Sequence, residues 1–148
     1  MEVNMENLNI NTGEIKLMIN EDPERVIEFN PDDIGFINEF YNLISEFDKK
    51  EKEYIERTEE AAKNTEVDQY GIPKNTGDTL KILKDFCEYM RTQIDCIFGE
   101  GTSDTAFGTT NTIDMFAQFF EGITPYVEKK RREKISQYTN REQRRAMK

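Results

Sequence analysis

The 148-residue sequence contains no histidine and no tryptophan, and it has only two cysteines. Histidine is the commonest metal ligand and the commonest general base near neutral pH. Its absence excludes zinc hydrolases, Ser-His and Cys-His nucleophile systems and two-His iron sites. If Cys87 and Cys96 share one helix, they lie about 13 Å apart along its axis and on opposite faces, so they cannot form a disulfide with each other.

Carboxylates, lysines and tyrosines remain as catalytic groups, but no pattern gathers them. The thirty acidic residues are spread along the chain without a recognisable metal loop. Acid-base catalysis requires carboxylates that converge in a dry pocket with a matched pKa, and nothing in the sequence indicates such convergence. We therefore predict that the protein is not an enzyme and uses neither a metal nor a cofactor.

Long apolar runs are also missing. No stretch approaches the roughly 18 apolar residues of a membrane span, and the N-terminal sequence MEVNMENLNINTGE lacks the basic and apolar regions of a signal peptide. The sequence therefore predicts a cytoplasmic protein that does not contact the membrane. Ten phenylalanines and six tyrosines are too many for a disordered chain, and the length fits one domain.

Charge is the most unevenly distributed property of the chain. Residues 128–148 include nine basic and three acidic residues, whereas residues 1–127 include 11 basic and 27 acidic ones. We therefore divide the chain into a globular domain over 1–127 and a basic C-terminal helical extension over 128–148. Such an extension can bind nucleic acid or a protein, but a basic helix end can also be simply solvated and stabilised by the helix dipole.

Residues 1–30 are expected to form a β-hairpin region. Its apolar residues alternate around Thr12-Gly13: Ile10, Ile15, Leu17 and Ile19. A second β-prone run, residues 25–30, follows Pro23. The pattern predicts two or three short strands joined by tight turns at Gly13 and Pro23. Because an isolated hairpin is barely stable in water, it must pack against the helices that follow.

Helical spacing of apolar residues predicts three helices after residue 30. The first covers 31–64, starts at an Asn30 cap and has a poorly buried second half. A loop over 65–77 leads to the second helix at 78–98. The third begins within 111–127, and a kink is expected at Pro125. The fold class is therefore α+β, mostly α, with a short N-terminal β-hairpin packed on a bundle of about three helices and a basic C-terminal helical tail.

The glycine-rich stretch FGEGTSDTAFG, residues 98–108, allows two interpretations. A phosphate loop needs a lysine beside its glycines, yet no lysine or arginine occurs between Gly99 and Tyr126. The alternative is a corner over 99–110, in which the glycines cap helix ends and residues 102–107 form a single helical turn. We favour the corner, and we expect Phe98 and Phe107 to fix it to the core.

Three segments together carry a resemblance to a known family. The β-hairpin leads into FNPDDIGFINEFY, then follow IDCIFGEGTSDTAFG and an aromatic helix that ends in YTNREQRRAMK. This arrangement is similar to the tail assembly chaperones of long-tailed, siphovirus-type bacteriophages of Gram-positive hosts. The resemblance spans most of the chain, and its most specific parts are FGEGTSDTAFG and NREQRRAMK.

The resemblance implies a non-enzymatic chaperone in the host cell cytoplasm. Such a protein coats the tape-measure protein, a very long helical chain, and keeps it soluble until tail-tube subunits displace it. The tape-measure protein is thus the expected partner, with the major tail tube protein and a second copy of the chain as further candidates. The alternative is a nucleic-acid-binding or regulatory phage protein that uses the basic tail, although the acidic body argues against nucleic acid.

Two sets of residues are candidates for partner binding. Apolar residues of the third helix occupy more than one face, so either the helix is buried on several faces or one face awaits a partner. We predict that the first set contacts a client or a second copy: Phe116, Phe119, Phe120 and Ile123. The alternative is that this set belongs to the core. The second set is a basic docking element: Arg131, Arg132, Arg144 and Arg145.

Overall fold

The computed structural model describes residues 3–146, except for the side chains at 138, 141–144 and 146. Its elements are β1 (Ile15–Ile19), β2 (Asp22–Phe29), α1 (Ile34–Ala62), α2 (Asn75–Phe98), α3 (Thr102–Phe107) and α4 (Ile113–Ala146). The two strands form one antiparallel sheet. The predicted fold class, mostly α with an N-terminal β-hairpin, is confirmed.

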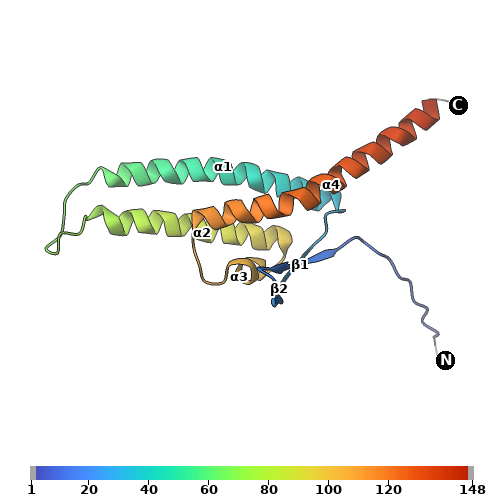
Figure 1. Cartoon of the computed structure of the whole chain (residues 1–148), viewed down its shortest axis with the longest axis horizontal. Coiled ribbons are helices and arrows are strands. Elements are labelled where there is room, and N and C mark those ends of the chain that lie inside the picture. Colours follow the sequence, from blue (N-terminus) through green and yellow to red (C-terminus); the bar gives the residue numbers. More distant parts are fainter. Residues whose placement is uncertain (1–2, 147–148) are drawn as a thin grey trace.

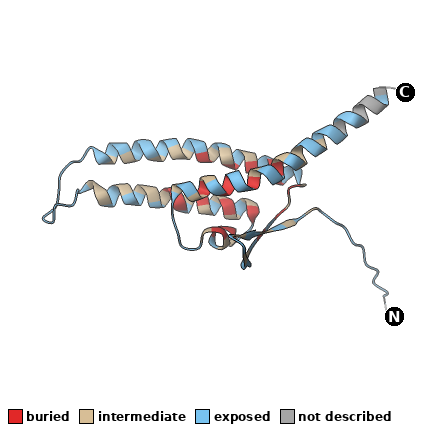
Figure 2. Cartoon of the chain, in the orientation of Figure 1, coloured by how far each residue is buried: buried red, intermediate tan, exposed pale blue. Residues whose placement is uncertain are grey.

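The three long helices meet in the middle of an elongated molecule (Figure 1). α1 and α2 run side by side and extend together to one end, whereas the second half of α4 projects at the other. Buried residues gather where the first half of α1, the second half of α2 and the first half of α4 converge (Figure 2). The hairpin and α3 lie against this region, which places them beside α4.

The core is built from aromatic rings. Phe98, the last residue of α2, lies 5.1 Å from Phe36 and 5.1 Å from Phe119 between ring centroids, and 5.7 Å from Phe29. Edge-to-face pairs at such distances add roughly 0.5–1.5 kcal/mol each beyond the area that they bury. One residue thereby joins β2, α1 and α4 around the end of α2.

The hairpin turns at a different place from the one predicted. The turn residues are Asn20 and Glu21, both with positive φ, at 53° and 61°, as a two-residue hairpin loop of the tight type requires. Gly13 precedes β1, and Pro23 lies within β2. Opposite Pro23, the pairing register shifts between Met18 and Ile19 of β1. The third predicted strand, around Ile10, is not paired in the structure.

The predicted starts of the first two long helices are wrong by three residues. Asp33, rather than Asn30, caps α1 through its side chain, which accepts a hydrogen bond from the Gly35 N–H. The Asn30 side-chain oxygen accepts from the Asp32 N–H in the turn before the helix, and the Asn30 amide donates to the Thr12 carbonyl. α2 begins at Asn75 rather than Asp78, because the Asn75 amide reaches back to two carbonyls at the end of α1 and just beyond it. Local side-chain bonds therefore decide these boundaries.

α4 continues through Pro125 as one helix of 34 residues. Proline removes a backbone donor, and the neighbouring Thr124 hydroxyl donates a 2.5 Å hydrogen bond to the Phe120 carbonyl one turn earlier. The buried part of the helix ends at Val127, which is fully buried. The basic extension is therefore a direct continuation of a core helix.

Candidate functional site

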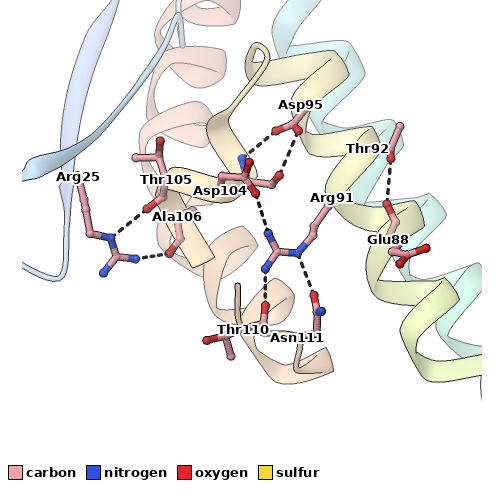
Figure 3. Close-up of polar contacts among 11 residues, drawn as sticks. Arg25, Glu88, Arg91, Thr92, Asp95, Asp104, Thr105, Ala106, Thr110 and Asn111 are labelled. Atoms are coloured by element: carbon pink, nitrogen blue, oxygen red, sulfur yellow. Dashed lines mark hydrogen bonds and ion pairs between the residues drawn. The ribbon is translucent and has the colours of Figure 1, made fainter. Parts of the chain in front are cut away.

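The glycine-rich stretch forms a corner whose polar groups bind one another. Gly101 precedes α3 in a left-handed conformation with φ 87°, and Gly108 follows it. Asp95 of α2 caps α3, since its carboxylate accepts from the Ser103 N–H at 2.8 Å and from the Ser103 hydroxyl at 3.1 Å (Figure 3). These bonds satisfy one of the backbone N–H groups that the start of a helix leaves without an intrahelical partner.

Two arginines tie the corner to the rest of the body (Figure 3). Arg25 of β2 donates to the carbonyls of Thr105 and Ala106, at 3.0 and 2.7 Å. Arg91 of α2 donates to the Thr110 carbonyl and, at 2.9 Å, to the side chain of Asn111. These bonds hold α3 between the hairpin and α2, and they fix the chain that leads into α4.

The predicted aromatic anchors of the corner are confirmed. Phe98 is buried, and Phe107 packs 5.2 Å from Phe116 and 5.5 Å from Phe119 between ring centroids. The Thr102 hydroxyl donates to the Gly99 carbonyl, and the Ser103 hydroxyl donates to Asp95 of α2. The stretch therefore has a structural role that accounts for its glycines, hydroxyls and aromatic rings.

An open groove of about 570 Å³ lies between the hairpin, α3 and α4. One wall is formed by hairpin residues: Leu17, Met18, Ile19, Asn20, Arg25 and Ile27. The other is formed by α4 residues: Met115, Gln118, Phe119, Gly122, Ile123 and Tyr126. Ala106, Phe107 and Thr110 close its end beside the corner. We call this space the hairpin groove.

The α4 wall of the hairpin groove follows the helical repeat. Its residues recur every three or four positions from Met115 to Tyr126, a length of about 17 Å or three turns. Gly122 lies in the middle of this stripe, and a Cβ added there would meet no atom within 4 Å. A missing side chain thus deepens a surface of mixed apolar and polar residues that is long enough to receive one helix of a partner.

The four apolar residues predicted to bind a partner all lie in the core. Phe116 is fully buried, and Phe119, Phe120 and Ile123 are buried as well. The burial matches the alternative stated for this set, that it belongs to the core. Only the edges of Phe119 and Ile123 border the hairpin groove, while α4 presents Met115, Gly122 and Tyr126 beside them.

A charged cluster fixes α4 to α1 where α4 leaves the body. Glu128 accepts a 2.5 Å hydrogen bond from the Tyr41 hydroxyl, and Arg131 donates to both of its carboxylate oxygens, at 3.1 and 2.7 Å. Arg132 adds a bond of 3.0 Å. The bonds from Arg131 and Tyr41 lower the pKa of Glu128 to about 2. Burial and the bond to Glu128 raise the pKa of Tyr41.

The second predicted set is divided between this cluster and the projecting helix. Arg131 and Arg132 pair with Glu128, as above, so part of their charge is compensated within the chain. Arg145 is exposed in the last turn of α4, and the side chain of Arg144 lies outside the described residues. Beyond Lys134, every α4 side chain that the structure describes is exposed. The basic residues of α4 therefore fall into two parts. Arg131 and Arg132 are bonded to Glu128, and those beyond Lys134 lie on the projecting end of the helix.

Sequence reasoning did not name the residues that open the groove. Gly122, for example, lies on the groove wall, in a helix that continues through Pro125. Its position, seven residues after Met115 and four before Tyr126, is the signal that could have found the stripe. The hairpin wall carries no such signal, because it depends on tertiary packing.

The described residues contain neither a metal-binding cluster nor a membrane-spanning helix. Among the side chains that the structure describes, no group of three or more histidine, cysteine or carboxylate side chains is arranged to hold a metal ion. Of the helices within residues 3–146, none combines the length and apolar character that a bilayer crossing requires.

Comparison with known proteins gave one match. No curated protein and no solved structure is significantly similar to the chain. Residues 26–148, from β2 to the C-terminal end, match a family of unknown function, DUF6673. This region includes the hairpin groove's α4 wall, the corner and the basic helix. The chain therefore belongs to the DUF6673 family.

Proposed function

We propose that this protein is a non-enzymatic chaperone of phage tail assembly that binds helical segments of the tape-measure protein in the hairpin groove. The observation that carries the proposal is the continuity of α4. One face of the helix forms an open wall from Met115 to Tyr126, in which apolar side chains alternate with Gln118 and Gly122, and the same helix then continues as a basic extension. A single client helix can contact both.

The geometry favours an amphipathic helix as the client. A partner helix places apolar side chains at i, i+3 or i+4 and i+7, and three such anchors span a wall of about 17 Å. Acidic client residues beyond the apolar stripe would meet the basic side chains that follow Glu128. The client class is therefore a helix with an apolar stripe and acidic residues at one end of it.

The identity of the client rests on the resemblance of the sequence. Tape-measure proteins are very long helical chains whose apolar faces stay exposed until the tail tube surrounds them. An acidic protein body, net −16 over residues 1–127, would keep a coated client soluble through charge repulsion. The major tail tube protein then displaces the chaperone from the client. These steps occur in the host cell cytoplasm.

Co-expression with helical fragments of a tape-measure protein tests the proposal. We expect the chaperone to keep at least one fragment soluble and to be captured with it. Gly122→Phe fills the groove from a position where a side chain meets no atom, so it should weaken binding at least tenfold while the protein stays folded. Binding that is unchanged in this variant would contradict the groove as the site, and failure to bind any fragment would contradict the function.

Gly77→Phe is the matched control. Gly77 also lies in a helix, α2, and an added Cβ there meets no atom within 4 Å, but it is not part of the groove wall. The same change in side chain and helix propensity is therefore made outside the site. We expect this variant to bind the client as tightly as the unmodified protein.

Removal of residues 135–148 tests the basic part separately. We expect weaker client binding that depends less on salt, because the projecting cations are lost, while folding is retained. Binding of a random DNA duplex at physiological salt, lost in the same truncation, would instead support the nucleic-acid alternative.

A further inference from the structure

The chain begins with an extended arm that is unusually apolar for an exposed segment. Over residues 3–12 the structure has neither helix nor strand. Four apolar side chains are between 71% and 95% exposed: Val3, Met5, Leu8 and Ile10. Scattered apolar residues are normal on a surface, but four in one short segment indicate a contact that a single copy does not make. We call residues 3–12 the arm.

The base of the arm is fixed to the body. Gly13 has φ 97°, and a Cβ added there would collide with the Asp32 side chain. The Asn30 amide donates to the Thr12 carbonyl at 2.7 Å. Figure 1 shows the arm leading away from the hairpin and the helices from this point. Because the turn that would fold it back onto β1 is not made, its own body does not cover it.

The arm contains a strand-like pattern of its own. Residues 7–11 read Asn-Leu-Asn-Ile-Asn, a strict alternation that is typical of a half-buried strand. β1 has the same length of five residues and also alternates, with apolar residues on its inner face. The segment is uncharged, so its pairing does not add to the repulsion between acidic bodies.

The sheet offers an edge for such a segment. In a two-stranded sheet each strand keeps one unpaired edge, and exposed edges are sites of strand addition. α3 lies against β2, where Arg25 bonds its carbonyls. β1 is the less covered strand: Ile15, Leu17 and Ile19 are only half-buried, and Met18 on the other face is 58% exposed.

We infer that two copies of the chain associate by exchanging their arms, with residues 7–11 of one copy pairing along the β1 edge of the other. Leu8 and Ile10 then lie on the inner face beside Leu17, and the asparagines lie on the solvent side. The arrangement is reciprocal, as a two-fold dimer requires. It goes beyond the proposed function and needs no client.

Light scattering of the client-free protein tests the association. At roughly 100 µM, a concentration that saturates a micromolar complex, we expect twice the 17.4 kDa mass of one chain. Leu8→Glu combined with Ile10→Glu should give a monomer of unchanged helicity, because the charges fall on the buried face. Val3→Glu with Met5→Glu, outside the paired segment, is the control that stays dimeric. A monomeric unmodified protein, or a dimer that survives the first pair of changes, would overturn the inference.

Crosslinking distinguishes exchange from pairing within one chain. In a Cys96→Ser background, Asn9→Cys and Lys16→Cys place thiols on the solvent face of the arm strand and of β1, while Cys87 stays buried. Oxidation of the double variant should give a covalent dimer. A disulfide inside a monomer would mean that the arm folds onto its own hairpin, and the inference would be wrong.

Discussion

The two halves of α4 have the same backbone and opposite surroundings. From Ile113 to Val127 the helix carries buried phenylalanines and forms one wall of the hairpin groove. From Glu128 onward it is basic and leads away from the body. The buried half is held by packing, and the projecting half by helix propensity and by the cluster around Glu128. One continuous helix thus connects the core to the exposed basic segment.

The largest difference should appear when one apolar side chain is shortened in each half. Phe116→Ala removes a fully buried ring that packs against Phe86 and Phe107, and such changes cost about 3–5 kcal/mol. Ile135→Ala removes a side chain that is 53% exposed, and we expect a change within about 0.5 kcal/mol. Urea unfolding followed by circular dichroism measures both.

Equal losses in the two variants would contradict this division of α4. A large loss for Ile135→Ala would mean that the projecting half is packed against another copy in solution. The comparison should therefore be made at several protein concentrations, because an effect of association depends on concentration and an effect of the core does not.

A smaller effect on stability is expected at Glu128, where the two halves of α4 meet. The pKa of Glu128 is lowered to about 2 in the folded protein, against an ordinary value of 4.5, so folding favours the charged form. The stabilisation that it provides is complete above pH 4.5 and is lost as the pH falls through 2. Glu128→Gln should therefore lose less stability than the unmodified protein between these pH values, as thermal unfolding at several pH values would show.

Tyr41→Phe sharpens the test. It removes one hydrogen bond to Glu128 but keeps the Arg131 pair, so the pH dependence should fall between the two other proteins. If all three proteins lost stability equally on acidification, the cluster would not stabilise the junction.

The fold class and the corner could be predicted because their signals are local. Glycines at 99, 101 and 108 and the spacing of apolar residues mark the helix ends and the buried faces. The start of α1 could not be predicted correctly, because Asn30 and Asp33 are both good caps. In the structure the Asn30 side-chain oxygen accepts from the Asp32 N–H and its amide donates to the Thr12 carbonyl, while the helix starts at the Asp33 cap. The sequence alone does not distinguish these two caps.

The candidate site was harder to predict, because an aromatic helix looks the same whether it faces a core or a partner. Phe116 and Phe120 were indistinguishable in sequence from exposed anchors, and only packing against α1 and α2 settled their burial. The groove depends on how the hairpin packs beside α4, and helical periodicity carries no information about that packing. The projecting tail was predictable, since its charge is a property of composition.

The smallest expected effect concerns the glycine in the middle of α4. Gly122 has helical backbone angles and open space around its Cβ position, so Gly122→Ala should stabilise the protein by about 0.5–1 kcal/mol. Gly77→Ala, in the first turn of α2, should give less, because backbone there is less constrained. For a chain of this size the first change raises Tm by roughly 1–4 °C. Because one methyl group leaves most of the groove open, Gly122→Ala should keep client binding that Gly122→Phe loses. If Gly122→Ala is more stable and still binds, the glycine lowers stability and its role is to keep the groove deep for the client. If Gly122→Ala does not bind, the client backbone itself approaches α4 at this point.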